Sequence, residues 1–107
     1  MPATISRDEL KGKMDRGEEF VLVEALPEEY FRKEHLPGAI NLPTSQVDAE
    51  AENRIPDKNA DIVVYCAGPH CDAAEQTARL LEAKGYAHVR DYKGGKKEWA
   101  ESGLPLV

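Results

Sequence analysis

The apolar residues near the start of the chain follow the pattern of an amphipathic helix. Ser6 and Glu9 form the sequence signature of a capping box, in which each side chain bonds the backbone of the other residue. Leu10 and Met14 follow at a spacing that places them on one helical face. A glycine then offers a typical stop, so the pattern predicts a helix over about residues 6–16.

Short aliphatic runs alternate with helical patterns along the rest of the chain. The most informative run is 61–66, where residues 62–65 are continuously apolar, as expected for a central strand buried on both faces. Further strands are predicted at 21–26, 39–42 and 89–92, and further helical segments at 28–33, 44–51, 72–84 and around Trp99. This alternation favours an α/β fold with a mostly parallel central sheet and helices on both faces.

Two of these helices carry residues that are typical of helix starts. Thr44 or Ser45 is expected to cap the helix that passes through Val47. Asp72 with Glu75 is expected to form a second capping box.

Length and charge restrict the possible functions. The 107 residues match one domain, so we expect a single domain over 1–107. The 14 basic and 20 acidic residues give a net charge of −6, which disfavours nucleic acid and anionic membrane as partners. The longest apolar run, 62–67, is too short to span a bilayer, and the polar start lacks a secretory signal. A cytoplasmic location is therefore expected.

Cys66 is the main candidate for chemistry, because it ends the predicted central strand. Ligands of open α/β sheets gather at the carboxyl ends of the strands. Backbone N–H groups in the following loop are expected to surround the sulfur and to lower its pKa, although Asp72 and Glu75 add opposing negative charge. The predicted site consists of the nucleophile Cys66 and the active-site loop Ala67, Gly68, Pro69, His70, Cys71 and Asp72.

Three motifs, in order along the chain, resemble those of rhodanese-like sulfurtransferase domains. They are the run 35–43, the strand end 64–66, and a C-terminal pattern made of Gly94, Gly95, Trp99 and the Gly-Leu-Pro at 103–105. The resemblance covers essentially residues 4–107. It implies a three-layer rhodanese-like domain whose cysteine, here Cys66, carries sulfane sulfur as a persulfide, and it implies no organic cofactor.

Two departures from the family pattern are visible in the sequence. Where the family usually has Asp-Val-Arg, this chain has Glu24, Ala25 and Leu26, so we expect the ion pair of the missing arginine to be absent. The segment from Cys66 to Gly85 also exceeds the usual spacing by two residues. Within a helix these residues would rotate the apolar face by about 200°, so we expect them to lengthen the loop.

The loop composition separates possible enzyme classes. Related domains with enlarged loops act as phosphatases or arsenate reductases, and these need an arginine that grips the oxyanion. Positions 67–76 hold no Arg or Lys, which argues against that chemistry. Three lysines follow the last strand, at positions 93, 96 and 97 (Lys93, Lys96 and Lys97). They either carry solvated surface charge or attract an anionic donor to the mouth of the site.

The predicted function is therefore sulfur transfer through Cys66. The donor would be thiosulfate, a persulfide or a polysulfide, and the acceptor a thiol, cyanide or a carrier protein. Two alternatives remain open: a binding or regulatory module that keeps the fold without catalysis, and a thiol redox protein that cycles Cys66 and Cys71 through a disulfide. No metal site is predicted, because the spacing of Cys66, His70 and Cys71 matches no closed zinc pattern.

Overall fold

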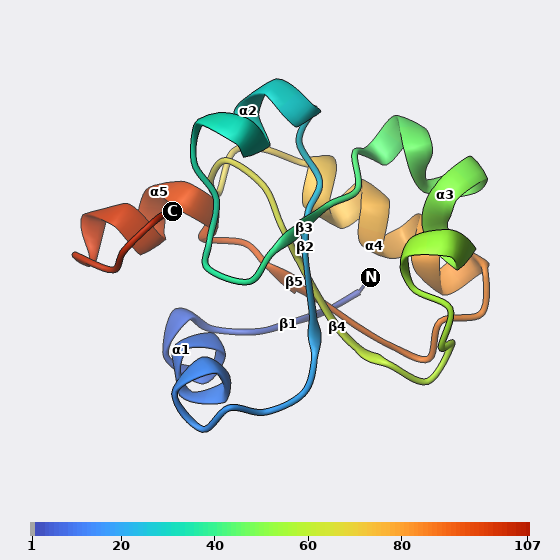
Figure 1. Ribbon diagram of the computed structural model, residues 1–107, viewed down its shortest axis with the longest axis horizontal. Coiled ribbons are helices and arrows are strands. Elements are labelled where there is room, and N and C mark those ends of the chain that lie inside the picture. Colours follow the sequence, from blue (N-terminus) through green and yellow to red (C-terminus); the bar gives the residue numbers. More distant parts are fainter. Residues whose placement is uncertain (1) are drawn as a thin grey trace.

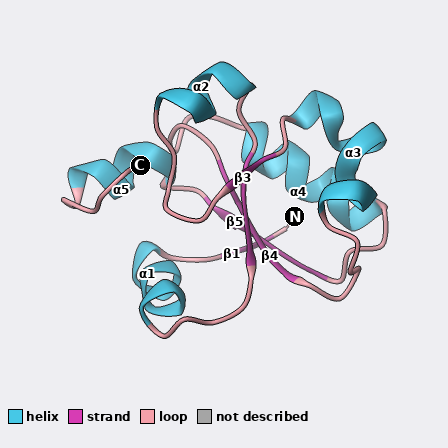
Figure 2. Ribbon diagram, in the orientation of Figure 1, coloured by secondary structure: helices cyan, strands magenta, loops and turns pink. Residues whose placement is uncertain are grey.

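The computed structural model describes residues 2–107 and contains a five-stranded sheet (Figures 1 and 2). The strands are β1 (Ala3–Thr4), β2 (Val21–Glu24), β3 (Ile40–Asn41), β4 (Asp61–Tyr65) and β5 (His88–Tyr92). Their order across the sheet is β1-β5-β4-β2-β3, and every neighbouring pair is parallel. The helices are α1 (Arg7–Asp15), α2 (Glu28–Lys33), α3 (Val47–Arg54), α4 (Ala73–Ala83) and α5 (Gly95–Glu101), with a 3₁₀ turn η1 (Thr44–Gln46) before α3. The predicted α/β class is confirmed.

The central strand β4 is buried on both faces, as its unbroken apolar run predicted. Ile62 and Val64 pack into the cluster formed with α3 and α4, whereas Val63 and Tyr65 pack into the cluster formed with α1 and α5. All four side chains are fully buried. In Figure 1, α1 and α5 accordingly lie on one side of the strands and α3 and α4 on the other. Three layers result, with a core on each side of the sheet.

The first helix forms for the reason given by its sequence. The Ser6 hydroxyl accepts a hydrogen bond from the Glu9 backbone at 3.1 Å, and the Glu9 carboxylate accepts one from the Ser6 backbone at 3.3 Å. Leu10 is fully buried beneath the helix. The predicted capping box is confirmed, and α1 differs from the predicted range by one residue at each end. The two-residue strand β1, which precedes the helix, was not predicted.

Both other predicted helix caps are wrong. Asp72 has φ −99° and ψ 3°, which is not the extended backbone that directs a capping side chain back to the helix. Its carboxylate instead accepts a hydrogen bond from the Gln76 side chain at 3.1 Å. The Thr44 hydroxyl lies 2.8 Å from the Thr77 hydroxyl and donates to the Ala73 carbonyl, so it joins η1 to α4 rather than capping its own helix.

The strand limits differ from prediction by one or two residues. β2 ends at Glu24 rather than at 26, and β3 covers only Ile40–Asn41 of the predicted 39–42. Within residues 2–107, no helix combines the length and apolar character needed to cross a membrane.

Candidate active site

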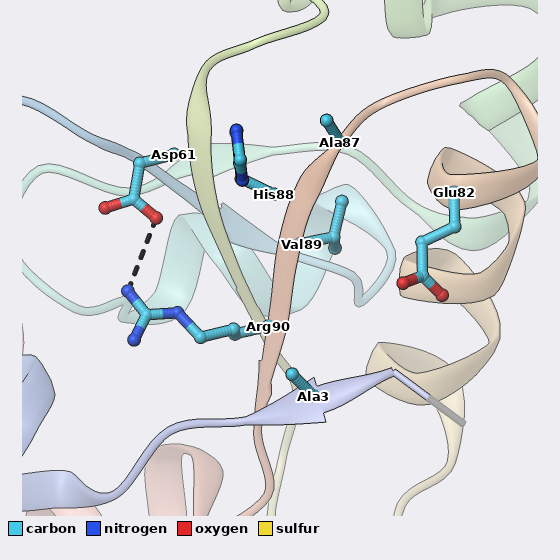
Figure 3. Close-up of a pocket in the computed structure, with 7 residues that line it drawn as sticks. All are labelled: Ala3, Asp61, Glu82, Ala87, His88, Val89 and Arg90. Atoms are coloured by element: carbon cyan, nitrogen blue, oxygen red, sulfur yellow. Dashed lines mark hydrogen bonds and ion pairs between the residues drawn. The ribbon is translucent and has the colours of Figure 1, made fainter.

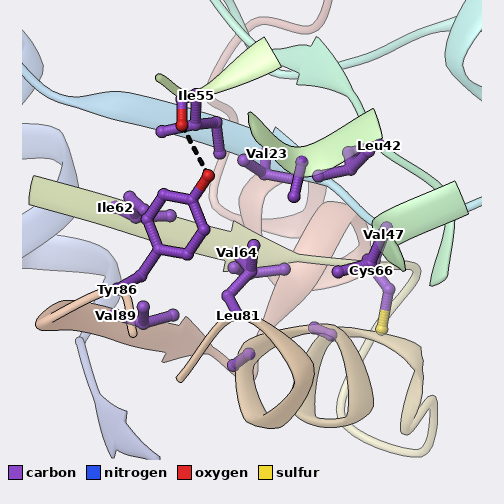
Figure 4. Close-up of a cluster of buried hydrophobic side chains, with 14 residues drawn as sticks. Val23, Leu42, Val47, Ile55, Ile62, Val64, Cys66, Leu81, Tyr86 and Val89 are labelled. Atoms are coloured by element: carbon purple, nitrogen blue, oxygen red, sulfur yellow. Dashed lines mark hydrogen bonds between the residues drawn. The ribbon is translucent and has the colours of Figure 1, made fainter. Parts of the chain in front are cut away.

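Cys66 follows the last residue of β4 and lies at the carboxyl end of the sheet. Its side chain is 2% exposed and belongs to the core cluster between the sheet and the helices α3 and α4. Figure 4 shows this side chain at the edge of the cluster, with its sulfur directed toward α4. The thiol donates a hydrogen bond to the Cys71 carbonyl at 3.3 Å. The predicted nucleophile is therefore at the expected edge of the sheet, but it is buried.

Burial dominates the ionisation of this thiol. Burial and, to a smaller extent, the adjacent Cys71 side chain raise the pKa of Cys66 to about 12. The backbone N–H groups of Ala74 and Ala67 favour the thiolate, but they do not offset the loss of hydration. The predicted lowering of the Cys66 pKa is thus wrong, because the loss of hydration outweighs the effect of the backbone N–H groups. Of these two donors, sequence reasoning found Ala67 and missed Ala74, which lies in the first turn of α4.

The loop after Cys66 folds back on itself through a tight turn. The Cys71 backbone N–H donates to the Gly68 carbonyl at 3.1 Å, which closes residues 68–71. A surface depression of about 290 Å³ is lined by Ala67, Gly68, Pro69, His70, Cys71 and Lys97. The structure therefore brings together all of the predicted loop residues except Asp72, which is exposed and is not part of the lining.

Lys97 is the cation of this depression, and the other two candidate lysines are occupied elsewhere. Lys96 pairs with Glu24 at 3.0 Å, and Lys93 pairs with Asp91 at 3.1 Å and with Glu75 at 3.3 Å. No ion pair of Lys97 is found among residues 2–107. Only one of the three lysines is thus left to meet an anion at the loop.

Helix α5 is docked directly onto the loop through its first residues. The backbone N–H groups of Lys96 and Lys97 donate to the carbonyls of Cys66 and Ala67 at 3.0 and 2.9 Å. Gly95 permits this contact, because its φ is +61° and a Cβ there would lie 2.5 Å from the Cys66 carbonyl oxygen. The glycine of the C-terminal motif is therefore required by close approach of two backbones.

A buried polar network lies next to this contact. Glu24 is fully buried, accepts a hydrogen bond from the Tyr65 hydroxyl at 2.8 Å and pairs with the Lys96 ammonium at 3.0 Å. The Tyr65 hydroxyl in turn accepts from the Leu36 backbone at 3.0 Å. Position 26 is a leucine, so the arginine of the family pattern is absent as the sequence shows, but Glu24 still has an ion pair because Lys96 from α5 supplies the positive charge.

A larger depression, of about 420 Å³, lies at the opposite end of the sheet (Figure 3). Asp61 and His88 in its wall are the first residues of β4 and β5, and Asp61 pairs with Arg90 at 3.3 Å. This depression is therefore remote from Cys66. Across residues 2–107, no group of three or more His, Cys, Asp or Glu residues gathers as metal ligands would.

The parallel sheet, the cysteine at the end of its central strand and the loop held by α5 define a class of three-layer α/β domains with a cysteine at the carboxyl edge of the sheet. The model of the rhodanese-like domain matches residues 6–102, and the chain belongs to this family.

Two relatives in sequence and one solved structure are similar to the chain. It is 34% identical to an HTH-type transcriptional regulator of Mycobacterium tuberculosis over 102 residues, which are 95% of this chain and 43% of that protein. It is 40% identical to the thiosulfate sulfurtransferase PspE of Escherichia coli, over 70% of this chain and 68% of PspE. The crystal structure of the BH2092 protein from Bacillus halodurans superposes with a TM-score of 0.91 at 24% identity, covering 98% of this chain and 76% of that chain, which supports the fold. The chain thus spans less than half of the regulator's length.

Proposed function

We propose that this chain is a sulfurtransferase in which Cys66 is the nucleophile. The observation that carries the proposal is the position of Cys66 at the carboxyl end of the central strand, at the start of the loop 67–72. Membership of the rhodanese-like family and the similarity to PspE support it. No cofactor is needed for the reaction.

The reaction proceeds in two displacements at sulfur. The Cys66 thiolate attacks the outer sulfur of thiosulfate, the S–S bond breaks, and sulfite leaves with the electron pair. The thiol proton passes to solvent. An acceptor, which is a thiol, cyanide or a carrier protein, then attacks the outer sulfur of the persulfide, and the Cys66 thiolate leaves. The N–H groups of Ala67 and Ala74 stabilise negative charge on the sulfur in both steps.

Anion recognition is assigned to the depression beside the loop. Lys97 supplies one positive charge there, and the loop supplies no other cation. A singly charged site suits the sulfonate end of thiosulfate or the terminal sulfur of a persulfide better than a phosphate ester, which usually requires a bidentate arginine. Because Cys66 is only 2% exposed, part of the loop 67–72 must move to admit the donor.

The Cys66→Ser variant tests the proposal. We expect it to lose transfer of sulfur from thiosulfate to cyanide by about a hundredfold or more, because a hydroxyl cannot carry a persulfide. Thiocyanate formation and the intact mass after thiosulfate treatment are the measurements, and the wild-type protein should gain one sulfur atom. Ser45→Ala is the matched control, since Ser45 is exposed and distant in sequence from the loop. Substantial activity in Cys66→Ser would move the nucleophile to Cys71 and overturn the assignment.

A regulatory module without catalysis is the second candidate. The burial of Cys66 favours it, as does the similarity to a transcriptional regulator. The same mass measurement distinguishes the two candidates, because a module that only binds a partner gains no sulfur from thiosulfate.

For the catalytic candidate, the proposed location is the cytoplasm, where thiols such as Cys66 and Cys71 stay reduced.

A further inference from the structure

The loop holds a second cysteine beside the first. The Cys66 thiol reaches the Cys71 carbonyl at 3.3 Å, and the Cys71 side chain packs against the buried cluster that contains Cys66. The turn closed by Gly68 and Cys71 directs the chain back toward the end of β4. Both cysteines are free thiols. The fold therefore places Cys71 next to Cys66.

The two thiols differ in what can reach them. Cys66 is 2% exposed, so an acceptor from solution meets only the outer sulfur of a persulfide built on it. Cys71 is half-buried: it forms part of the depression at the loop and also packs against the buried cluster that contains Cys66. Cys71 can thus approach the inner sulfur, which is shielded from external nucleophiles.

We propose that Cys71 is a resolving cysteine, which attacks the Cys66 sulfur of the persulfide and releases hydrosulfide. This inference rests on the proposed function, because it needs a persulfide at Cys66. The Cys71 thiolate forms a bond to Cys66 Sγ, the bond between the inner and outer sulfur breaks, and the outer sulfur leaves as HS⁻. The sulfane sulfur is reduced, the two thiols are oxidised to a disulfide, and no external oxidant is consumed.

The choice of the inner sulfur follows from the leaving groups. Attack on the outer sulfur would expel the Cys66 thiolate, which is a poor leaving group because burial raises its pKa. Attack on the inner sulfur expels hydrosulfide, the conjugate base of a stronger acid. A low-molecular-weight thiol then regenerates the protein by attacking the more accessible Cys71 sulfur of the disulfide. The chain would thereby couple sulfur uptake to sulfide release.

Persulfide lifetime in the wild-type protein and in Cys71→Ser tests this inference. Each protein is loaded with thiosulfate, or in a parallel arm with inorganic polysulfide, and is then freed of donor and thiols. We expect wild-type protein to convert from one added sulfur to the loss of two hydrogens, with one hydrosulfide released per disulfide. Cys71→Ser should keep its added sulfur about tenfold longer or more. Cys71→Ala serves as a second replacement, and Ser45→Ala as the control that should decay like the wild type.

The outcomes separate this inference from the proposed function. Loading by polysulfide but not by thiosulfate contradicts the proposed donor, while the decay of the loaded protein still decides the role of Cys71. Equal persulfide lifetimes with and without Cys71 overturn the inference and leave the transferase intact. Peptide mapping that finds the added sulfur on Cys71 also overturns it, because the outer sulfur would then have been attacked. If no sulfur is found on Cys66 of the Cys71→Ser variant in either arm, both proposals are wrong.

Discussion

The charge state of Cys66 depends on a competition between hydration and two backbone donors. The N–H groups of Ala67 and Ala74 favour the thiolate, while burial and the Cys71 side chain favour the thiol. Burial is the stronger effect and raises the pKa to about 12, so the resting protein holds Cys66 protonated at neutral pH. Reaction with a donor then requires a change that rehydrates the sulfur or brings a further positive charge to it.

Alkylation against pH measures this competition directly. In Cys71→Ser, where Cys66 is the remaining cysteine, we expect the rate with iodoacetamide to keep rising above about pH 10, because burial raises the pKa of the thiol. An ordinary thiol would level off above its pKa of about 8.5. In the wild-type protein, the half-buried Cys71 should be modified before Cys66, as peptide mass mapping would show. The urea-unfolded variant is the control and should show the ordinary midpoint, whereas such a midpoint in the folded variant contradicts the effect of burial.

At the scale of elements, the start of α5 fixes the shape of the loop. The helix presents two backbone N–H groups to the carbonyls of Cys66 and Ala67, and Gly95 makes room for them. Any Cβ at Gly95 would displace the loop backbone or the helix. The loop thus has one wall made of a helix whose sequence lies about thirty residues further along the chain.

Replacing Gly95 distinguishes the cost of a strained backbone from the cost of a steric clash. Gly95→Ala is expected to lower the free energy of unfolding by more than about 1 kcal/mol, because it combines a positive φ with a clash against Cys66. Gly103→Ala is the matched control, since Gly103 has φ +77° but open space around it, and it should show the strain alone. Urea denaturation gives the stabilities, and thiocyanate assays should show that only Gly95→Ala impairs transfer. Equal losses of stability in the two variants would contradict the close approach.

The helices and strands also show which contacts could be predicted from the sequence and which could not. The capping box of Ser6 was predictable because both partners lie within one turn of helix. The Thr44 cap was not, because its hydroxyl finds Thr77 on another helix, and no local pattern reports that contact. In the same way, the sequence places Cys66 at a strand end and suggests the loop after it, but burial of the sulfur and the selection of Lys97 depend on packing between distant segments.

At the scale of the whole molecule, the buried carboxylate of Glu24 joins three parts of the fold. It accepts a hydrogen bond from the hydroxyl of Tyr65 on the central strand and forms an ion pair with the ammonium of Lys96 on α5. The Tyr65 hydroxyl extends the network to the Leu36 backbone, in the segment before β3. A charge in this position is stable only while its partner is present, because the side chain of Glu24 is fully shielded from water.

Removal of the partner should therefore destabilise the protein strongly. We expect Lys96→Met to lower the free energy of unfolding by about 3–5 kcal/mol, because it leaves an uncompensated buried carboxylate. The double variant Glu24→Gln, Lys96→Met should recover part of this loss, since the charge is removed together with its partner. Urea denaturation of both variants and of Glu24→Gln completes the cycle. A change within about 1 kcal/mol for Lys96→Met would show that the pair is not structurally important.

Lys96 contacts two regions of the protein, the interior of the sheet and the loop after Cys66, so it also affects local motion. Its side chain holds the interior of the sheet through Glu24, and its backbone N–H holds the carbonyl of Cys66. A transient fraying of α5 would release the loop after Cys66 while the strands of the sheet stay paired, since sub-global openings need less free energy than complete unfolding. The frequency with which α5 opens would then set how often the buried sulfur meets solvent.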